Sequence, residues 1–136
     1  MIDLTGATAS TIIKSTKTAK IREERLDGYT YRIEYPHARH AYYVTVTHAN
    51  GIPKEIFVNS QNTDDAAWIS ALSRLVSINL RSGVPVEVVA EELISTVDPK
   101  GGWFSEGKYY NSLLSKIGDI LLGMKGVGKC ESCADG

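Results

Sequence analysis

The spacing of apolar residues changes once along the chain, and this change limits the folds that the chain can adopt. Between residues 28 and 59 apolar and polar side chains alternate, as in "YTYRIEY" and "AYYVTVTH". That period of two is typical of strands with one buried face. From residue 63 onward apolar residues recur every three or four positions, as on helices that are buried along one side. The sequence therefore predicts an α+β fold, in which helices cover one face of a small antiparallel sheet.

Three strands are expected within residues 28–59, connected in chain order as an antiparallel meander. Pro36 ends the first strand, because proline cannot donate a hydrogen bond to a neighbouring strand. Asn50 and Gly51 separate the second strand from the third, since both residues tolerate the positive φ of a two-residue hairpin turn.

Three helices are expected, at about residues 63–82, 85–95 and 109–122. The first has Asn62 or Thr63 as its N-cap, and two aspartates in its first turn suit the positive end of the helix dipole. A glycine follows its last turn and a proline opens the second helix, as is common at helix ends. The segment "VDPKGGWFSEGK" before the third helix is expected to be a loop.

A single core is expected between the sheet and the helices. From the strands and the first helix we assign to it Val44, Val46, Ile56, Val58, Trp68, Leu72 and Leu75. The third helix adds apolar residues spaced by three and four positions, namely Tyr110, Leu113, Leu114, Ile117, Ile120 and Leu121. The chain is expected to form one domain at residues 20–123, between a flexible arm at 1–19 and a flexible glycine-rich tail at 124–136.

The charge balance argues against two classes of partner. Fifteen basic and sixteen acidic side chains give a net charge of -1, which does not favour attraction to nucleic acid or to an anionic membrane. No apolar run has the length of a membrane-spanning helix or of a signal-peptide core, so we expect a cytoplasmic protein. Five strand tyrosines are interpreted as core and cross-strand pairs rather than as a platform for stacked bases: Tyr29, Tyr31, Tyr35, Tyr42 and Tyr43.

The only two cysteines of the chain, Cys130 and Cys133, form a C-x-x-C pair in the glycine-rich tail. The pair fits a dithiol that carries electrons, because neighbouring thiols form a disulfide readily. It also fits half of a tetrahedral zinc site, with further ligands from histidines or from a second chain. Two inert surface cysteines are the third interpretation, and the motif alone leaves all three open.

The histidines do not form a convincing metal site. His37 and His40 in "HARH" lie in a turn between strands, where a spacing of three does not place both rings on one face. No acidic residue within that segment completes a ligand set, so we interpret them as solvated turn histidines. No catalytic motif and no cofactor motif is present either, which makes activity by this chain alone doubtful.

The loop after the second helix is the remaining candidate for ligand or partner binding. Gly101 and Gly102 would expose backbone amides, while Lys100 and Lys108 add positive charge, as in a phosphate cradle that could hold a nucleotide. The segment lacks the spacing of a P-loop, and no strand leads into it. The alternative is a turn in which Trp103 packs back onto the sheet.

Several stretches, taken in order, resemble a known family. They are "GYTYRIEYPHARHAYYVTV", "KEIFVNSQNTDDAAWISALSRLVSINLRSG", "VVAEELISTVDPKGG" and the closing C-x-x-C. Together they resemble the TSCPD domain, which occurs toward the C-terminus of vitamin-B12-dependent ribonucleotide reductases and in short free-standing relatives, some of them carried by phages. The resemblance covers about residues 28–122. Its most specific parts are the "EIFVNS" strand that leads into the following helix, and "DPKGG".

The resemblance implies a place in deoxynucleotide synthesis. In such reductases a C-terminal cysteine pair re-reduces the active-site disulfide after each turnover, and Cys130 and Cys133 match that element. The radical-bearing barrel and the cobalamin-binding region have no counterpart here, because 136 residues cannot contain them. The expected function is therefore a non-catalytic accessory module that docks on a reductase large subunit and offers its tail as a dithiol.

Two other expectations stay open at this point. The chain could instead be a phage or mobile-element interaction module that binds a host enzyme or a defence factor, with incidental cysteines. A homodimer is also expected, through an edge strand or a helix face, because a three-stranded sheet has exposed edges that natural proteins usually cover or pair.

Overall fold

The structure is a computed structural model that describes residues 22–124. It confirms the α+β fold, and its elements follow the order β1 (Asp27–Ile33), β2 (Tyr42–Ala49), β3 (Ile52–Ser60), α2 (Ala66–Arg81), α3 (Val86–Ile94), β4 (Trp103–Ser105), β5 (Lys108–Tyr110) and α4 (Leu113–Met124). The arm expected at 1–19 and the tail from residue 125 onward lie outside the described residues, and so do Cys130 and Cys133.

The three long strands form an antiparallel sheet in the order β1-β2-β3, as predicted. Asn50 and Gly51 make the turn between β2 and β3 with φ angles of 54° and 77°, the conformation that their sequence indicated. Val44 of β2 lies between Tyr31 of β1 and Val58 of β3, so these residues share one face of the sheet. That face carries the core.

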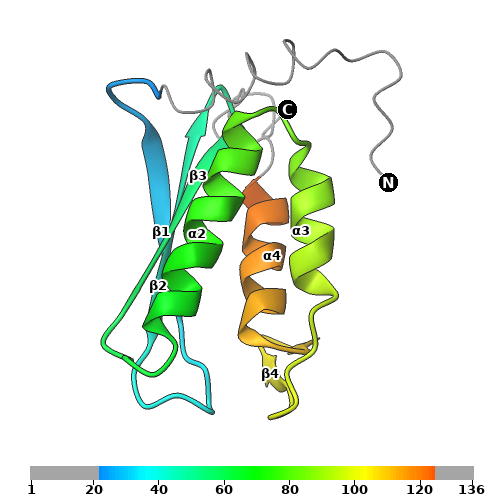
Figure 1. Ribbon diagram of the computed structural model, residues 1–136. Helices are drawn as coiled ribbons and strands as arrows, with labels where there is room; N and C mark the ends of the chain where they lie inside the picture. Colours follow the sequence, from blue (N-terminus) through cyan, green and yellow to red (C-terminus); the bar gives the residue numbers. More distant parts are fainter. Residues whose placement is uncertain (1–21, 125–136) are drawn as a thin grey trace, which may run out of the picture.

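All three helices lie on the same side of the sheet (Figure 1). Helix α2 follows β3, and α4 lies between the strands and α3. Ile117 and Leu121 of α4 are completely buried, and Gly118 lets α3 approach closely, because a Cβ there would lie 2.8 Å from the carbonyl oxygen of Ala90. The other face of the sheet is left without a helix in the described part of the chain, and Tyr43 and Phe57 are exposed on it.

The segment before the last helix differs from the prediction. Residues 103–110 form a short hairpin of β4 and β5 rather than a loop, and α4 begins at Leu113 rather than near residue 109. The turn residues Glu106 and Gly107 both have positive φ, at 51° and 80°, which suits a two-residue hairpin. Tyr110 is buried as expected, but on β5 instead of on the helix.

Helix α2 differs more. It begins at Ala66, later than predicted, with Asp65 rather than Asn62 or Thr63 as its N-cap, and the Asp65 carboxylate accepts a hydrogen bond from Tyr42 instead of capping the helix. The prediction that Trp68 and Leu75 belong to the core is wrong: they are 80% and 61% exposed. The buried residues of α2 lie on a neighbouring stripe, rotated about one position along the helix, and comprise Ser73, Val76, Ser77 and Leu80.

The buried carboxylate of Glu55 joins three parts of the fold. It accepts a hydrogen bond of 3.2 Å from Thr47 on β2 and pairs with Arg81 at the end of α2 at 3.1 Å. Arg22, the first described residue, pairs with the same carboxylate at 3.2 Å. A buried carboxylate is costly unless its oxygens are satisfied, and here they are. This cluster fixes the end of α2 against the start of β3.

Candidate functional site

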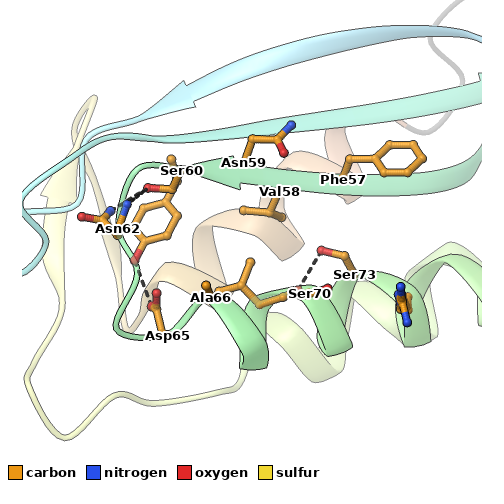
Figure 2. A pocket seen from close by; sticks show the side chains of 12 residues that line it. Phe57, Val58, Asn59, Ser60, Asn62, Asp65, Ala66, Ser70 and Ser73 are labelled. Atoms are coloured by element: carbon orange, nitrogen blue, oxygen red, sulfur yellow. Dashed lines mark hydrogen bonds between the residues drawn. The ribbon is translucent and has the colours of Figure 1, made fainter.

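A groove of about 320 Å³ lies between the outer edge of β3 and the first half of α2 (Figure 2). Figure 2 shows Val58 pointing from the strand toward the helix, and Asn59 pointing away from it. The apolar part of the lining comes from Val58, Ala66 and Ile69, while Ser70 and Ser73 add hydroxyl groups from the helix. The groove is therefore apolar in its depth and polar along its sides.

The backbone of β3 faces this groove. Ile56 donates its amide to the Ser77 hydroxyl at 3.0 Å and accepts a hydrogen bond from the same hydroxyl at 3.1 Å, so its backbone points away from β2. Backbone direction alternates along an antiparallel strand, which means that the amide and carbonyl of Val58 point outward as well. Within residues 22–124 no group bonds to that outward amide or carbonyl.

One end of the groove is bordered by a polar cluster. The Tyr42 hydroxyl donates to the Asp65 carboxylate at 2.9 Å, and burial together with this hydrogen bond raises the pKa of Tyr42 to about 12. The Asn62 amide group donates to the Ser60 hydroxyl and to the carbonyl of His40, both at 2.7 Å. These bonds tie the β1–β2 loop to the segment between β3 and α2.

The other end of the groove carries a cation. Arg74 lines this end and also a smaller hollow that extends to Ser77. The ring of Phe57 lies on the far side of β3, away from α2, and is 46% exposed (Figure 2). No carboxylate pairs with Arg74 in the described part of the chain. An unpaired guanidinium at the rim of a groove favours an anionic group in whatever binds there.

Another, more polar hollow of about 430 Å³ adjoins the groove at the polar cluster. It is lined by groups that are far apart in the sequence, including His37, His40, Asp64 and Lys100. The two stretches that carry the most specific family resemblance, the β3–α2 connection and "DPKGG", therefore meet at one place.

A tyrosine–aspartate pair holds the "DPKGG" loop against the sheet. The Tyr35 hydroxyl donates to the Asp98 carboxylate at 2.8 Å. Hydrogen bonds from the Lys100 amide and from Tyr35 lower the pKa of Asp98, and burial together with the Asp98 carboxylate raises the pKa of Tyr35. The loop is thus pre-shaped, with Lys100 at the hollow.

The two glycines of the predicted binding loop have distinct structural roles. Gly101 has a φ of 95°, a backbone conformation that favours glycine. Gly102 lies directly against the carbonyl of Tyr110, where a Cβ atom would collide with the backbone. Its amide donates to the Tyr109 hydroxyl at 3.2 Å, so this amide is already used within the fold.

The other predicted loop residues lie in different surroundings. Trp103 packs against Tyr35, with ring centroids 5.0 Å apart. This agrees with the alternative prediction, in which Trp103 packs inward instead of forming a binding loop. Lys108 pairs with Asp119 of α4 at 2.8 Å and does not line the polar hollow. The structure therefore brings Lys100 to the hollow, uses Trp103 in packing and places Lys108 elsewhere.

Metal ligands do not converge in the described residues. No group of three or more histidine, cysteine, aspartate or glutamate side chains is arranged to hold a metal ion between residues 22 and 124. The ring of His37 makes an edge contact with Tyr35 at 5.2 Å. Cys130 and Cys133 are outside this part of the chain, so their three interpretations stay as the sequence leaves them.

The outward face of α2 is a functional candidate that the sequence pattern concealed. Trp68 and Leu75 are two turns apart on one side of the helix, so both project from the same exposed face. Their spacing equals that of a buried stripe, and for that reason they were assigned to the core. What distinguishes the buried face of α2 from the exposed one is the hydrogen bond from the Ser77 hydroxyl to the Ile56 carbonyl of β3. This contact cannot be read from the sequence of the helix.

Comparison with known proteins identifies the chain at the level of the family. No curated protein and no solved structure matches it. No helix between residues 22 and 124 is long and apolar enough to cross a membrane. The family model of the TSCPD domain matches residues 13–136, and the chain therefore belongs to the TSCPD domain family.

Proposed function

We propose that this protein is a non-catalytic accessory module that docks on the large subunit of a ribonucleotide reductase. The TSCPD domain is associated with ribonucleotide-reductase-related proteins. The observation that carries the docking role is the exposed face of α2, where Trp68 is four-fifths exposed and Leu75, two turns further along the same side, is exposed as well. We take the two side chains as parts of one apolar stripe, because contiguous exposed apolar surface marks interaction sites in soluble proteins, whereas single exposed apolar residues are ordinary.

Trp68 suits the role of an anchor. Tryptophan is enriched among the residues that contribute most to binding energy at protein interfaces, because it buries a large area with few rotatable bonds. The helix beneath it is held rigidly by the Glu55 cluster and by the Ser77 contacts to β3, so binding does not require the surface to become ordered first.

The second part of the proposal concerns Cys130 and Cys133 of the C-terminal tail. Docking of the domain would raise the effective concentration of the tail near the reductase active site. There the two tail thiols become a disulfide while the active-site disulfide becomes two thiols, so two electrons and two protons are transferred. A dithiol protein of the thioredoxin class then reduces the tail again.

Docking is tested with the purified protein and the large subunit from the same organism. Trp68→Ala should weaken the complex at least about tenfold, as truncation of an aromatic anchor does. Val88→Ala is the matched control, because Val88 is also an exposed apolar side chain, at 51%, but belongs to α3. An affinity that is unchanged by Trp68→Ala would remove this face from the proposal.

The dithiol role needs a separate measurement. In a multiple-turnover assay with a thioredoxin system, the Cys130→Ser/Cys133→Ser double variant should slow reduction while its affinity for the large subunit stays the same. Equal turnover with and without the cysteines would exclude the dithiol role and leave docking intact.

The alternative function is an interaction module for a different host enzyme or a defence factor. The exposed α2 face supports it equally, since nothing in that face requires a reductase as the partner. No binding to the large subunit, combined with Trp68-dependent binding to an identified unrelated protein, would favour this alternative over the reductase.

A further inference from the structure

The groove between β3 and α2 offers an open strand edge of limited length. Among residues 22–124 nothing bonds to the outward backbone of Val58, whereas that of Ile56, two residues earlier, is occupied by the Ser77 hydroxyl. A bound segment could therefore add to the sheet beside Val58 and Ser60, but it could not continue past Ile56. Pairing of an extended peptide with a free sheet edge beside a helix is a common mode of peptide recognition.

The closed edge at Ile56 requires the bound segment to end or turn away there. An added strand that runs antiparallel to β3 places its C-terminus at this point, and a parallel one places its N-terminus there. Arg74 stands at the same end of the groove and lacks a carboxylate partner among residues 22–124. A guanidinium binds a carboxylate in a two-pronged arrangement and repels an ammonium group. The charge thus selects the antiparallel orientation.

From this geometry we infer that the groove binds the free C-terminus of a partner protein as an added antiparallel strand, with the terminal carboxylate on Arg74. The inference rests on the docking role proposed above and specifies a second contact for it. In such a strand, alternate side chains point to the same side. The one that faces the helix enters the apolar part of the groove at Val58 and Ile69, so an apolar residue is expected there.

This contact is separate from the Trp68 face. Arg74 and Ser70 are one helical turn apart and line the groove, whereas Trp68 precedes Ser70 by two residues and so lies on the opposite side of α2. One partner could occupy both sides of the helix, but each contact can be removed without the other.

The probe is an array of random hexapeptides attached through their N-termini, so that every C-terminus is free, and a second array of the same peptides with amidated C-termini. The best peptide from the first array is then synthesised for affinity measurement. The free acid should bind at least about tenfold more tightly than its amide, as expected for the loss of a charged hydrogen-bonding partner. Methylation of the peptide nitrogen that faces Val58 should also weaken binding, because it removes the strand hydrogen bond.

Two variants complete the design. Arg74→Ala should abolish the preference for the free acid, so that acid and amide bind equally weakly, and Val88→Ala, at an exposed position of α3 outside the groove, should leave both affinities unchanged. Equal binding of acid and amide to the unaltered protein would overturn the inference. So would the absence of any bound peptide, whether the protein sediments as a monomer or as a dimer. No reductase is present, so failure of reductase docking does not affect this test.

Discussion

Helices α2 and α4 cover the same face of the sheet, but they bury different kinds of residues. Helix α4 buries Leu113, Ile117 and Leu121 on one apolar stripe with a spacing of four, and Ser115 is buried beside that stripe rather than on it. Helix α2 turns Ser73 and Ser77 inward and leaves Trp68 outside. The reason is its position, since α2 lies along the open edge of β3 and bonds to the strand backbone, whereas α4 lies between the strands and α3.

The difference between α2 and α4 shows when the apolar pattern of a helix identifies its buried side. A helix surrounded by apolar neighbours buries its apolar stripe, because the removal of apolar surface from water is the main favourable contribution to its packing. A helix beside a strand edge gains hydrogen bonds by burying small hydroxyl groups, so part of its apolar surface stays outside. That exposed surface is what makes α2 a candidate for binding, while α4 serves the core.

The largest effect is expected from the apolar stripe of α4. Ile117→Ala should lower the free energy of unfolding by about 2 to 5 kcal/mol, because it removes buried methyl groups and leaves a cavity in a fully packed site. Leu122→Ala, five residues further along the same helix and 39% exposed, is the control and should cost less than about 1 kcal/mol. Urea unfolding measures both. Similar losses for the two variants would contradict the assignment of the buried stripe.

A smaller effect is expected from the polar stripe of α2. Ser77→Ala leaves the amide and the carbonyl of Ile56 without their partner, which should cost about 1 to 3 kcal/mol. Ser70→Ala, on the same helix but exposed, is the matched control and should change stability by no more than about 0.5 kcal/mol. If Ser77→Ala is as harmless as Ser70→Ala, the strand edge is not closed by this hydroxyl.

Much of the sheet and of α4 could be predicted because their local signals agree with their surroundings. Val44 and Val46 alternate with threonines and are buried, as expected. The turn at Asn50 and Gly51 needs no information beyond the two residues themselves. By contrast, the β4–β5 hairpin depends on Glu106 at positive φ, which a residue other than glycine, asparagine or aspartate rarely adopts and no pattern indicates.

The candidate site could be predicted only in part. The "DPKGG" loop was singled out from its glycines and lysines, and Lys100 does line a polar hollow. The groove itself was missed, because its existence depends on α2 lying along β3 with Ser77 on the strand backbone. The contact between Ile56 and Ser77 joins residues 21 positions apart through polar groups. Neither the spacing of apolar residues nor helix propensity predicts such a contact.

The polar end of α2 gives a prediction that depends on pH. Burial and the hydrogen bond to Asp65 raise the pKa of Tyr42 from its ordinary value near 10 to about 12. A raised pKa means that the folded protein holds this proton more tightly than the unfolded chain. The stability that it contributes is therefore complete below about pH 10 and is lost as the pH rises toward 12. The loss attributable to Tyr42 should reach about 1 kcal/mol by pH 10.5.

Unfolding by urea at pH 9 and at pH 10.5 measures this loss. Tyr42→Phe has no proton to lose at this position, so its stability should fall less over the same interval than that of the unaltered protein. Asp65→Asn should have an intermediate loss, because burial of the ring remains while the carboxylate is gone. An equal fall in all three proteins would contradict the assigned cause of the shift.

The smallest effect on stability is expected from the outward face of α2. Trp68→Ala removes the largest side chain of the helix, yet it should change the free energy of unfolding by no more than about 0.5 kcal/mol, because little of the ring is buried. A tryptophan in a core would instead cost about 3 to 5 kcal/mol on the same substitution. The two expectations differ by so much that one urea unfolding curve separates them. A loss above about 2 kcal/mol would return Trp68 to the core and remove the difference between α2 and α4, and with it the anchor on which the docking proposal depends.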